Sequence, residues 1–148
     1  MKNGIEQALK NGYALGFWAS GGRVRIVAIM NKDHKTVVAG ESGLLSSAYE
    51  KANAKWFKHL EKFSSARRKS IGGAKNCKFV FSLFGELDHW VAMNGWLGAH
   101  YDNHSEVFIV KLDGYDDNIN KVIQLGFHQD LLKAIERAFH APKVRKDR

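Results

Sequence analysis

The residues best suited to chemistry lie at positions 100–106, where the sequence reads HYDNHSE. If this stretch is extended, His100, Asp102, His104 and Glu106 project to the same face, because alternate side chains of an extended chain point the same way. Imidazoles and carboxylates can bind a divalent metal or act as acid and base. No second cluster with metal-ligand spacing accompanies them. We therefore expect no metal site, no catalytic residues and no cofactor, and His100, Asp102 and His104 are the candidate ligands if a metal does bind.

A second feature is a row of cations on a predicted helix. Four lysines share one side of it: Lys51, Lys55, Lys58 and Lys62. A loop without acids follows at 64–76, with the cations Arg67, Arg68, Lys69 and Lys75. Such a row can neutralise a phosphate backbone, and nearby aromatic rings can stack on unpaired bases. The aromatic candidates are Trp56, Phe57 and Trp18. The alternative is a solvated helix flank that only keeps the protein soluble.

The charge of the chain is strongly segregated. Its net charge is +8, and residues 51–78 carry nine lysines and arginines against one acid. Residues 79–142 hold nine acids and four bases, and residues 143–148 form a basic tail. Clustered positive charge attracts polyanions or acidic protein surfaces. Contact between the basic and acidic regions of two copies would also drive self-association.

Elements that would position these residues can be predicted from hydrophobic periodicity and turn signals. In the first half we expect a helix at 3–10, strands at 13–18, 23–30 and 36–39, and a helix from residue 42 or 47 to 63. In the second half we expect strands at 77–84, 89–93 and 105–112, an irregular glycine-rich stretch at 94–103, and helices at 118–125 and 128–140. This order predicts an α+β fold, α-βββ-α-βββ-αα, with about six antiparallel strands and the helices packed on one face.

Two segments resemble known nucleic-acid-binding folds. Residues 3–63 are similar in element order to the double-stranded RNA-binding domain, including the small residues Ala48, Ala52 and Ala54 of the second helix. That family has lysines in the first turn of this helix, where this chain has Leu44-Leu45-Ser46-Ser47. Residues 119–135, with Gly126 at a turn, allow a helix-turn-helix, although a simple helical corner is the preferred interpretation.

Length and composition complete the predictions. A chain of 148 residues with 45% hydrophobic and 26% charged residues has the composition of one globular domain. We expect a single domain at 1–142, with similar halves at 1–63 and 77–142 joined by the basic loop 64–76, and a disordered tail at 143–148. The single cysteine, Cys77, excludes an internal disulfide, and no apolar run is long enough to span a membrane. Both features favour a cytoplasmic protein.

The function that best fits these observations is a non-enzymatic nucleic-acid-binding module that uses residues 51–78, with DNA and RNA both open as ligands. A protein-binding inhibitor or adaptor that docks through charged surfaces is the alternative. An enzyme at residues 100–106, dependent on a metal or on acid–base groups, is a third hypothesis.

Overall fold

The structure is a computed structural model that describes residues 4–20, 23–63, 84–85, 87–88, 90–91, 95–115 and 121–145. Its helices are α1 (Gly4–Lys10), α2 (Leu45–Phe63) and α4 (Leu131–Phe139). Its strands are β1 (Ala14–Ser20), β2 (Val24–Met30), β3 (Thr36–Ser42), β4 (Trp96–Asp102), β5 (Val107–Tyr115), β6 (Lys121–His128) and β7 (Val144–Arg145). The predicted α+β class is confirmed.

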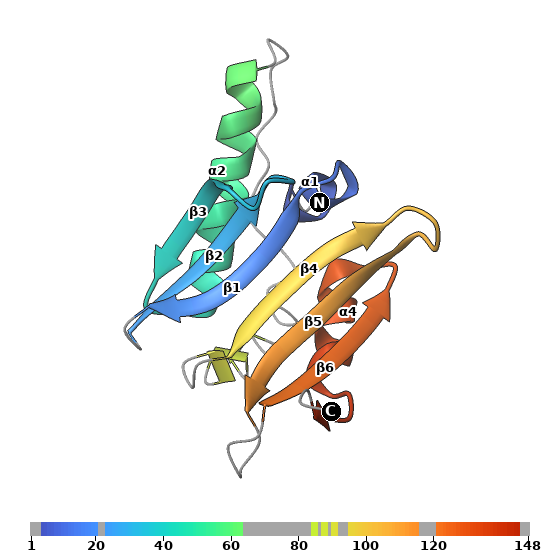
Figure 1. Ribbon diagram of the computed structural model, residues 1–148. Helices are drawn as coiled ribbons and strands as arrows, with labels where there is room; N and C mark the ends of the chain where they lie inside the picture. The colour runs from blue at the N-terminus through green and yellow to red at the C-terminus, as the bar shows by residue number, and fades with distance from the viewer. Residues whose placement is uncertain are drawn as a thin grey trace.

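All the strands join one antiparallel sheet in the order β3-β2-β1-β4-β5-β6-β7. Strands β1 and β4 meet at its centre, where Gly16 is paired with Gly98. The labelled helices lie on one face of the sheet, as predicted, and leave the other face toward the viewer in Figure 1. We call this second face the open face.

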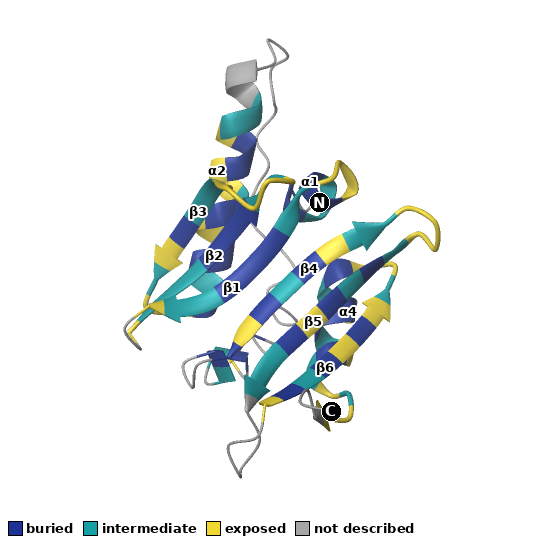
Figure 2. Ribbon diagram, viewed as in Figure 1, coloured by how far each residue is buried: buried dark blue, intermediate teal, exposed yellow. Residues whose placement is uncertain are grey.

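The core lies between the sheet and the helices. Along each strand every second residue turns inward, so buried and exposed residues alternate along β6 in Figure 2. The rings of Phe17, Tyr49 and Phe84 meet edge-on or tilted, with centroids 4.9–6.1 Å apart. This cluster joins β1, α2 and the helical residues that precede β4 into one apolar layer.

The two halves of the sheet make matching contacts with their helices. A Cβ added to Gly40 of β3 would lie 2.2 Å from the carbonyl oxygen of Ala48, and one added to Gly126 of β6 would lie 2.2 Å from that of Ala134. Both glycines therefore let a helix backbone approach the strand closely. The buried residues Leu45, Ala48, Tyr49 and Ala52 of α2 have counterparts on α4 in Leu131, Ala134, Ile135 and Ala138.

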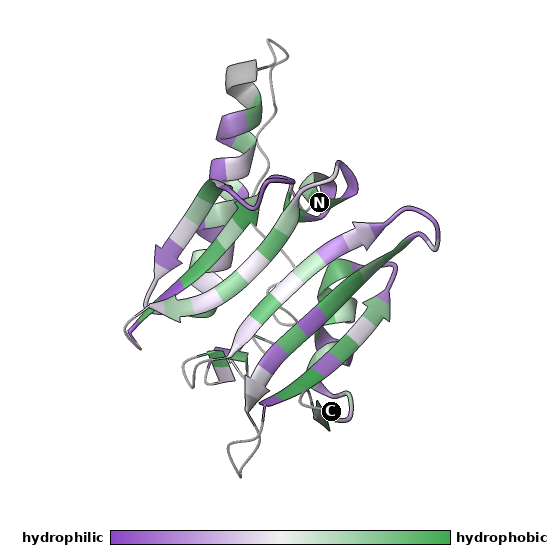
Figure 3. Ribbon diagram, viewed as in Figure 1, coloured by the Kyte–Doolittle hydropathy of each residue, from purple (hydrophilic) through white to green (hydrophobic). Residues whose placement is uncertain are grey.

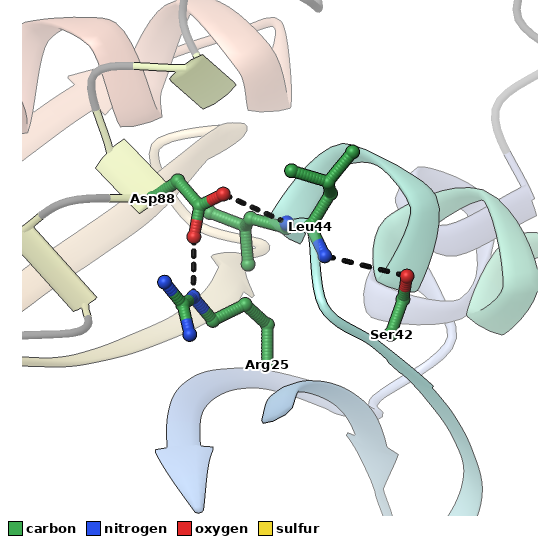
Figure 4. Close-up of polar contacts among 5 residues, drawn as sticks. Arg25, Ser42, Leu44 and Asp88 are labelled. Atoms are coloured by element: carbon green, nitrogen blue, oxygen red, sulfur yellow. Dashed lines mark hydrogen bonds and ion pairs between the residues drawn. The ribbon is translucent and has the colours of Figure 1, made fainter. Parts of the chain in front are cut away.

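Each half also supplies a carboxylate to the helix of the other half. Asp88, which precedes β4, accepts a hydrogen bond from the first backbone N–H of α2, at Leu45 (3.4 Å). Glu6 of α1 accepts one from the first N–H of α4, at Leu131 (2.9 Å). Figure 4 shows Asp88 between the start of α2 and Arg25 of β2, with which it forms an ion pair. In the same view, Ser42 accepts a hydrogen bond from the backbone N–H of Leu44.

Several element assignments in the second half were wrong. The predicted strand at 89–93 is contradicted by Trp90 and Val91, which are helical, and the stretch expected to be irregular contains β4. The predicted helix at 118–125 is largely replaced by β6, which also excludes the helix-turn-helix. Residues 77–83 of the predicted strand at 77–84 lie outside the described residues, and Phe84 is helical.

The remaining predicted helices and strands are confirmed, whereas the prediction for the tail is corrected. The helix expected at 128–140 is confirmed as α4, and β1, β2, β3 and α2 lie close to their expected positions. The tail predicted to be disordered contributes β7, which pairs Val144 with Ile123 of β6. Residues 146–148 lie outside the described part of the chain.

Candidate nucleic-acid interface

The lysine row of α2 lies along β3, the edge strand of the sheet. Lys51 donates from Nζ to the carbonyl oxygen of Glu41 (3.1 Å), and Lys55 donates to that of Ala39 (2.8 Å). Residues four positions apart lie one turn apart on the same face of a helix, so both ammonium groups reach alternate carbonyls of one strand. Two positive charges thus lie beside this strand edge.

Next to these lysines is an open groove of about 410 Å³ between α2 and β3. Its lining residues are Val37, Val38, Ala39, Lys55, Lys58 and His59. The imidazole of His59 stacks on the indole of Trp56, with ring centroids 5.3 Å apart. Hydrophilic residues recur along the exposed part of α2 in Figure 3. The groove therefore combines an aliphatic wall with cationic side chains.

The structure brings together only part of the predicted basic surface. Lys51, Lys55 and Lys58 are exposed on the same side of α2. The side chain of Lys62 is not described, and Arg67, Arg68, Lys69 and Lys75 lie outside the described residues.

The predicted stacking residues do not gather at this groove. Trp56 and Phe57 are only 2% and 9% exposed, so their rings belong to the core and are not available to a base. Trp18 is partly exposed but lies on the open face, because its neighbour Phe17 points into the core. Sequence reasoning missed His59, although its spacing of four residues from Lys55 was a usable signal, because residues four apart share one side of a helix.

At the His/Asp segment, the structure corrects the geometry that was expected. Strand β4 ends at Asp102, and a turn follows at 103–106, so His104 does not continue the alternation of His100 and Asp102. Hydrogen bonds from the side chain (2.6 Å) and backbone (3.2 Å) of Ser105 lower the pKa of Asp102. The carboxylate of Asp102 thus stabilises the turn.

Among the described residues, no three or more His, Cys, Asp or Glu side chains are placed to hold a metal ion. Within the same residues, no helix combines the length and hydropathy of a membrane span.

Comparison with known proteins gives no family for this chain. No protein-family model, no curated protein and no solved structure matches it. We therefore infer its function from the chemistry of its surfaces.

Proposed function

We propose that this chain is a non-enzymatic nucleic-acid-binding protein that holds a phosphate backbone along α2 and β3. The observation that carries the proposal is the alignment of Lys51, Lys55 and Lys58 beside the groove at the sheet edge. The basic sequence that continues through Arg67, Arg68 and Lys69 extends the same charge along the chain. We place the protein in the cytoplasm, in keeping with its single cysteine.

The lysine contacts favour binding of an anion. Each ammonium group has three donors, and the carbonyl bond of Lys51 or Lys55 uses one of them. Because the carbonyl holds each ammonium group in place, phosphate binding costs less side-chain entropy than it would with a free lysine. Each phosphate contact also releases counterions, so we expect affinity to fall steeply with salt.

The test is fluorescence-anisotropy titration with single- and double-stranded DNA and RNA at about 50 mM and about 200 mM salt. We expect one of these ligands to bind, and the double variant Lys55→Glu/Lys58→Glu to lose more than about tenfold in affinity. The salt dependence of the remaining binding should also become shallower.

The chain offers a matched control in Lys133→Glu/Arg137→Glu on α4. Arg137 donates to the carbonyl oxygen of Phe127 on β6, as Lys55 does to that of Ala39 on β3, and Lys133 is exposed. This control changes the net charge by the same amount as Lys55→Glu/Lys58→Glu, and it also removes one hydrogen bond to a strand carbonyl. Equal losses in both variants would mean that net charge alone drives binding, and the proposal would then be wrong.

A further inference from the structure

The large exposed hydrophobic side chains gather on the open face. Among the described residues these are Trp96 (40% exposed), Leu125 (45%), Phe127 (47%), Val144 (61%) and Leu44 (58%). The first four lie on the open face, since Trp96, Leu125 and Phe127 alternate with buried residues and Val144 is paired with Ile123. Only Leu44 lies elsewhere, before α2. Hydrophobic residues that cluster in this way mark an interaction surface more often than scattered ones do.

Two tryptophans cover the centre of this face. The rings of Trp18 and Trp96 lie across the glycine pair of β1 and β4, because a Cβ on Gly16 would be 3.1 Å from the ring of Trp18 and one on Gly98 would be 2.6 Å from that of Trp96. Large side chains here would hold the rings away from the sheet. The glycines therefore allow a flat aromatic surface.

The charges of the open face distinguish it from the basic groove. The Nζ atom of Lys111 on β5 lies 3.9 Å from Oδ2 of Asp113. Glu41 of β3 is exposed on the same face. Charges of both signs thus occur here although the whole chain carries +8. A face with both charges attracts a polyanion only weakly. Two copies of the open face, in contrast, do not repel each other strongly.

The side chains of the open face are small toward β3 and large toward β6. One row across the sheet, read from the strand register, is Ala39, Ala28, Gly16, Gly98, Lys111 and Leu125. A two-fold axis parallel to the central strands, placed above the face, would set β6 of one copy over β3 of the other. Leu125 of one copy would then meet Ala39 of the other, and Lys111 would come near Glu41.

The area of the face suits a stable dimer. Strands lie about 4.8 Å apart and rise about 3.3 Å per residue, so six strands of about seven residues present roughly 700 Å². Stable interfaces bury about 800 Å² per partner. Paired sheets separated by about 10 Å are a common way to bury such faces.

We propose that a second copy of this chain covers the open face and forms a two-fold symmetric, face-to-face dimer. This interface reaches the basic groove at Ala39 of β3 but uses none of its lysines, so it does not depend on nucleic-acid binding. The dimer buries Trp18, Trp96, Leu125 and Phe127 and leaves α2 of each copy on the outside.

Sedimentation equilibrium on nuclease-treated protein tests the proposal. We expect a mass of twice 16.7 kDa at micromolar concentration. Leu125→Glu/Phe127→Glu should weaken dimerisation more than about a hundredfold with an unchanged circular dichroism spectrum, because both side chains are already exposed. Leu44→Glu is the control for an exposed hydrophobic residue outside the face, and this variant should remain dimeric. A wild-type monomer up to about 100 μM, or an unaffected dimer in the double variant, would overturn the proposal.

A charge exchange tests the arrangement of the two copies. Lys111→Glu should weaken the dimer about tenfold, because it places two carboxylates near each other. Adding Glu41→Lys should restore it. Failure of the second change to restore dimerisation would contradict the proposed orientation of the two copies. A dimer that dissociates on nuclease treatment would show that nucleic acid, not the open face, joins the copies.

Discussion

At the residue scale, Asp88 links parts of the chain that are distant in sequence. Its carboxylate pairs with Arg25 of β2 and accepts a hydrogen bond from Leu45 at the start of α2. The side chains of Arg25 and Asp88 are only 13% and 15% exposed, so the ion pair is largely shielded from water. A carboxylate at a helix N-terminus also interacts favourably with the helix dipole.

We therefore expect Asp88→Ala to lower the free energy of unfolding by about 2 kcal/mol, because it removes a helix cap and leaves Arg25 without this partner. Urea denaturation followed by circular dichroism measures the change. Asp130→Ala is a suitable comparison, since the side chain of Asp130 makes no capping hydrogen bond at α4 and should cost less. Equal effects of the two substitutions would contradict the role given to Asp88.

At the element scale, two glycines determine how closely helices pack on the sheet. Gly40 faces Ala48 and Ala52 of α2, and Gly126 faces Ala134 and Ala138 of α4. Small residues on both sides let the helix backbone almost touch the strand. The same close approach brings Lys51 within reach of a carbonyl of β3 and Arg137 within reach of a carbonyl of β6.

Adding a methyl group at either contact should destabilise the protein. We expect Gly40→Ala and Gly126→Ala each to cost about 3 kcal/mol, because the new Cβ would lie 2.2 Å from a helix carbonyl oxygen that cannot easily move. Thermal unfolding measures both. Gly43→Ala is the control, with nothing within 4 Å of its Cβ, and should change stability by less than about 1 kcal/mol. A mild effect at Gly40 or Gly126 would show that the helix can shift away.

Glycine also explains the errors in the predicted elements. The stretch that contains Gly95 and Gly98 was expected to be irregular, and Gly126 was placed at a helical turn. In the structure Gly98 lies beneath the ring of Trp96, and Gly126 lies beneath α4, both inside strands. Sequence periodicity alone cannot distinguish a glycine that turns the chain from one that makes room for a neighbour.

At the scale of the whole molecule, the two halves are bound to each other in a reciprocal way. They share the central β1–β4 pairing, Asp88 caps α2, and Glu6 caps α4. Loss of α1 would remove the cap of α4, and loss of the helical residues around Asp88 would remove the cap of α2. The fold should therefore behave as one cooperative unit.

Hydrogen exchange can test this cooperativity with Glu6→Ala. We expect the exchange rates of the most protected amides to rise about fivefold in α2 as well as in α4, because a lost cap of about 1 kcal/mol weakens the whole unit. Thermal transitions seen by tryptophan fluorescence and by circular dichroism should also coincide. A rise confined to α4 would show that the two halves open independently.

Sequence alone was enough to predict the α+β class, the positions of the first-half strands and α2, and the row of lysines at 51, 55 and 58. These follow from local periodicity, which acts between residues near each other in the chain. Three features could be seen only in the folded chain: Trp56 and Phe57 are buried, Trp18 and Trp96 share the open face, and β6 is a strand. Those outcomes depend on contacts between distant segments, and long-range packing overrides local preference.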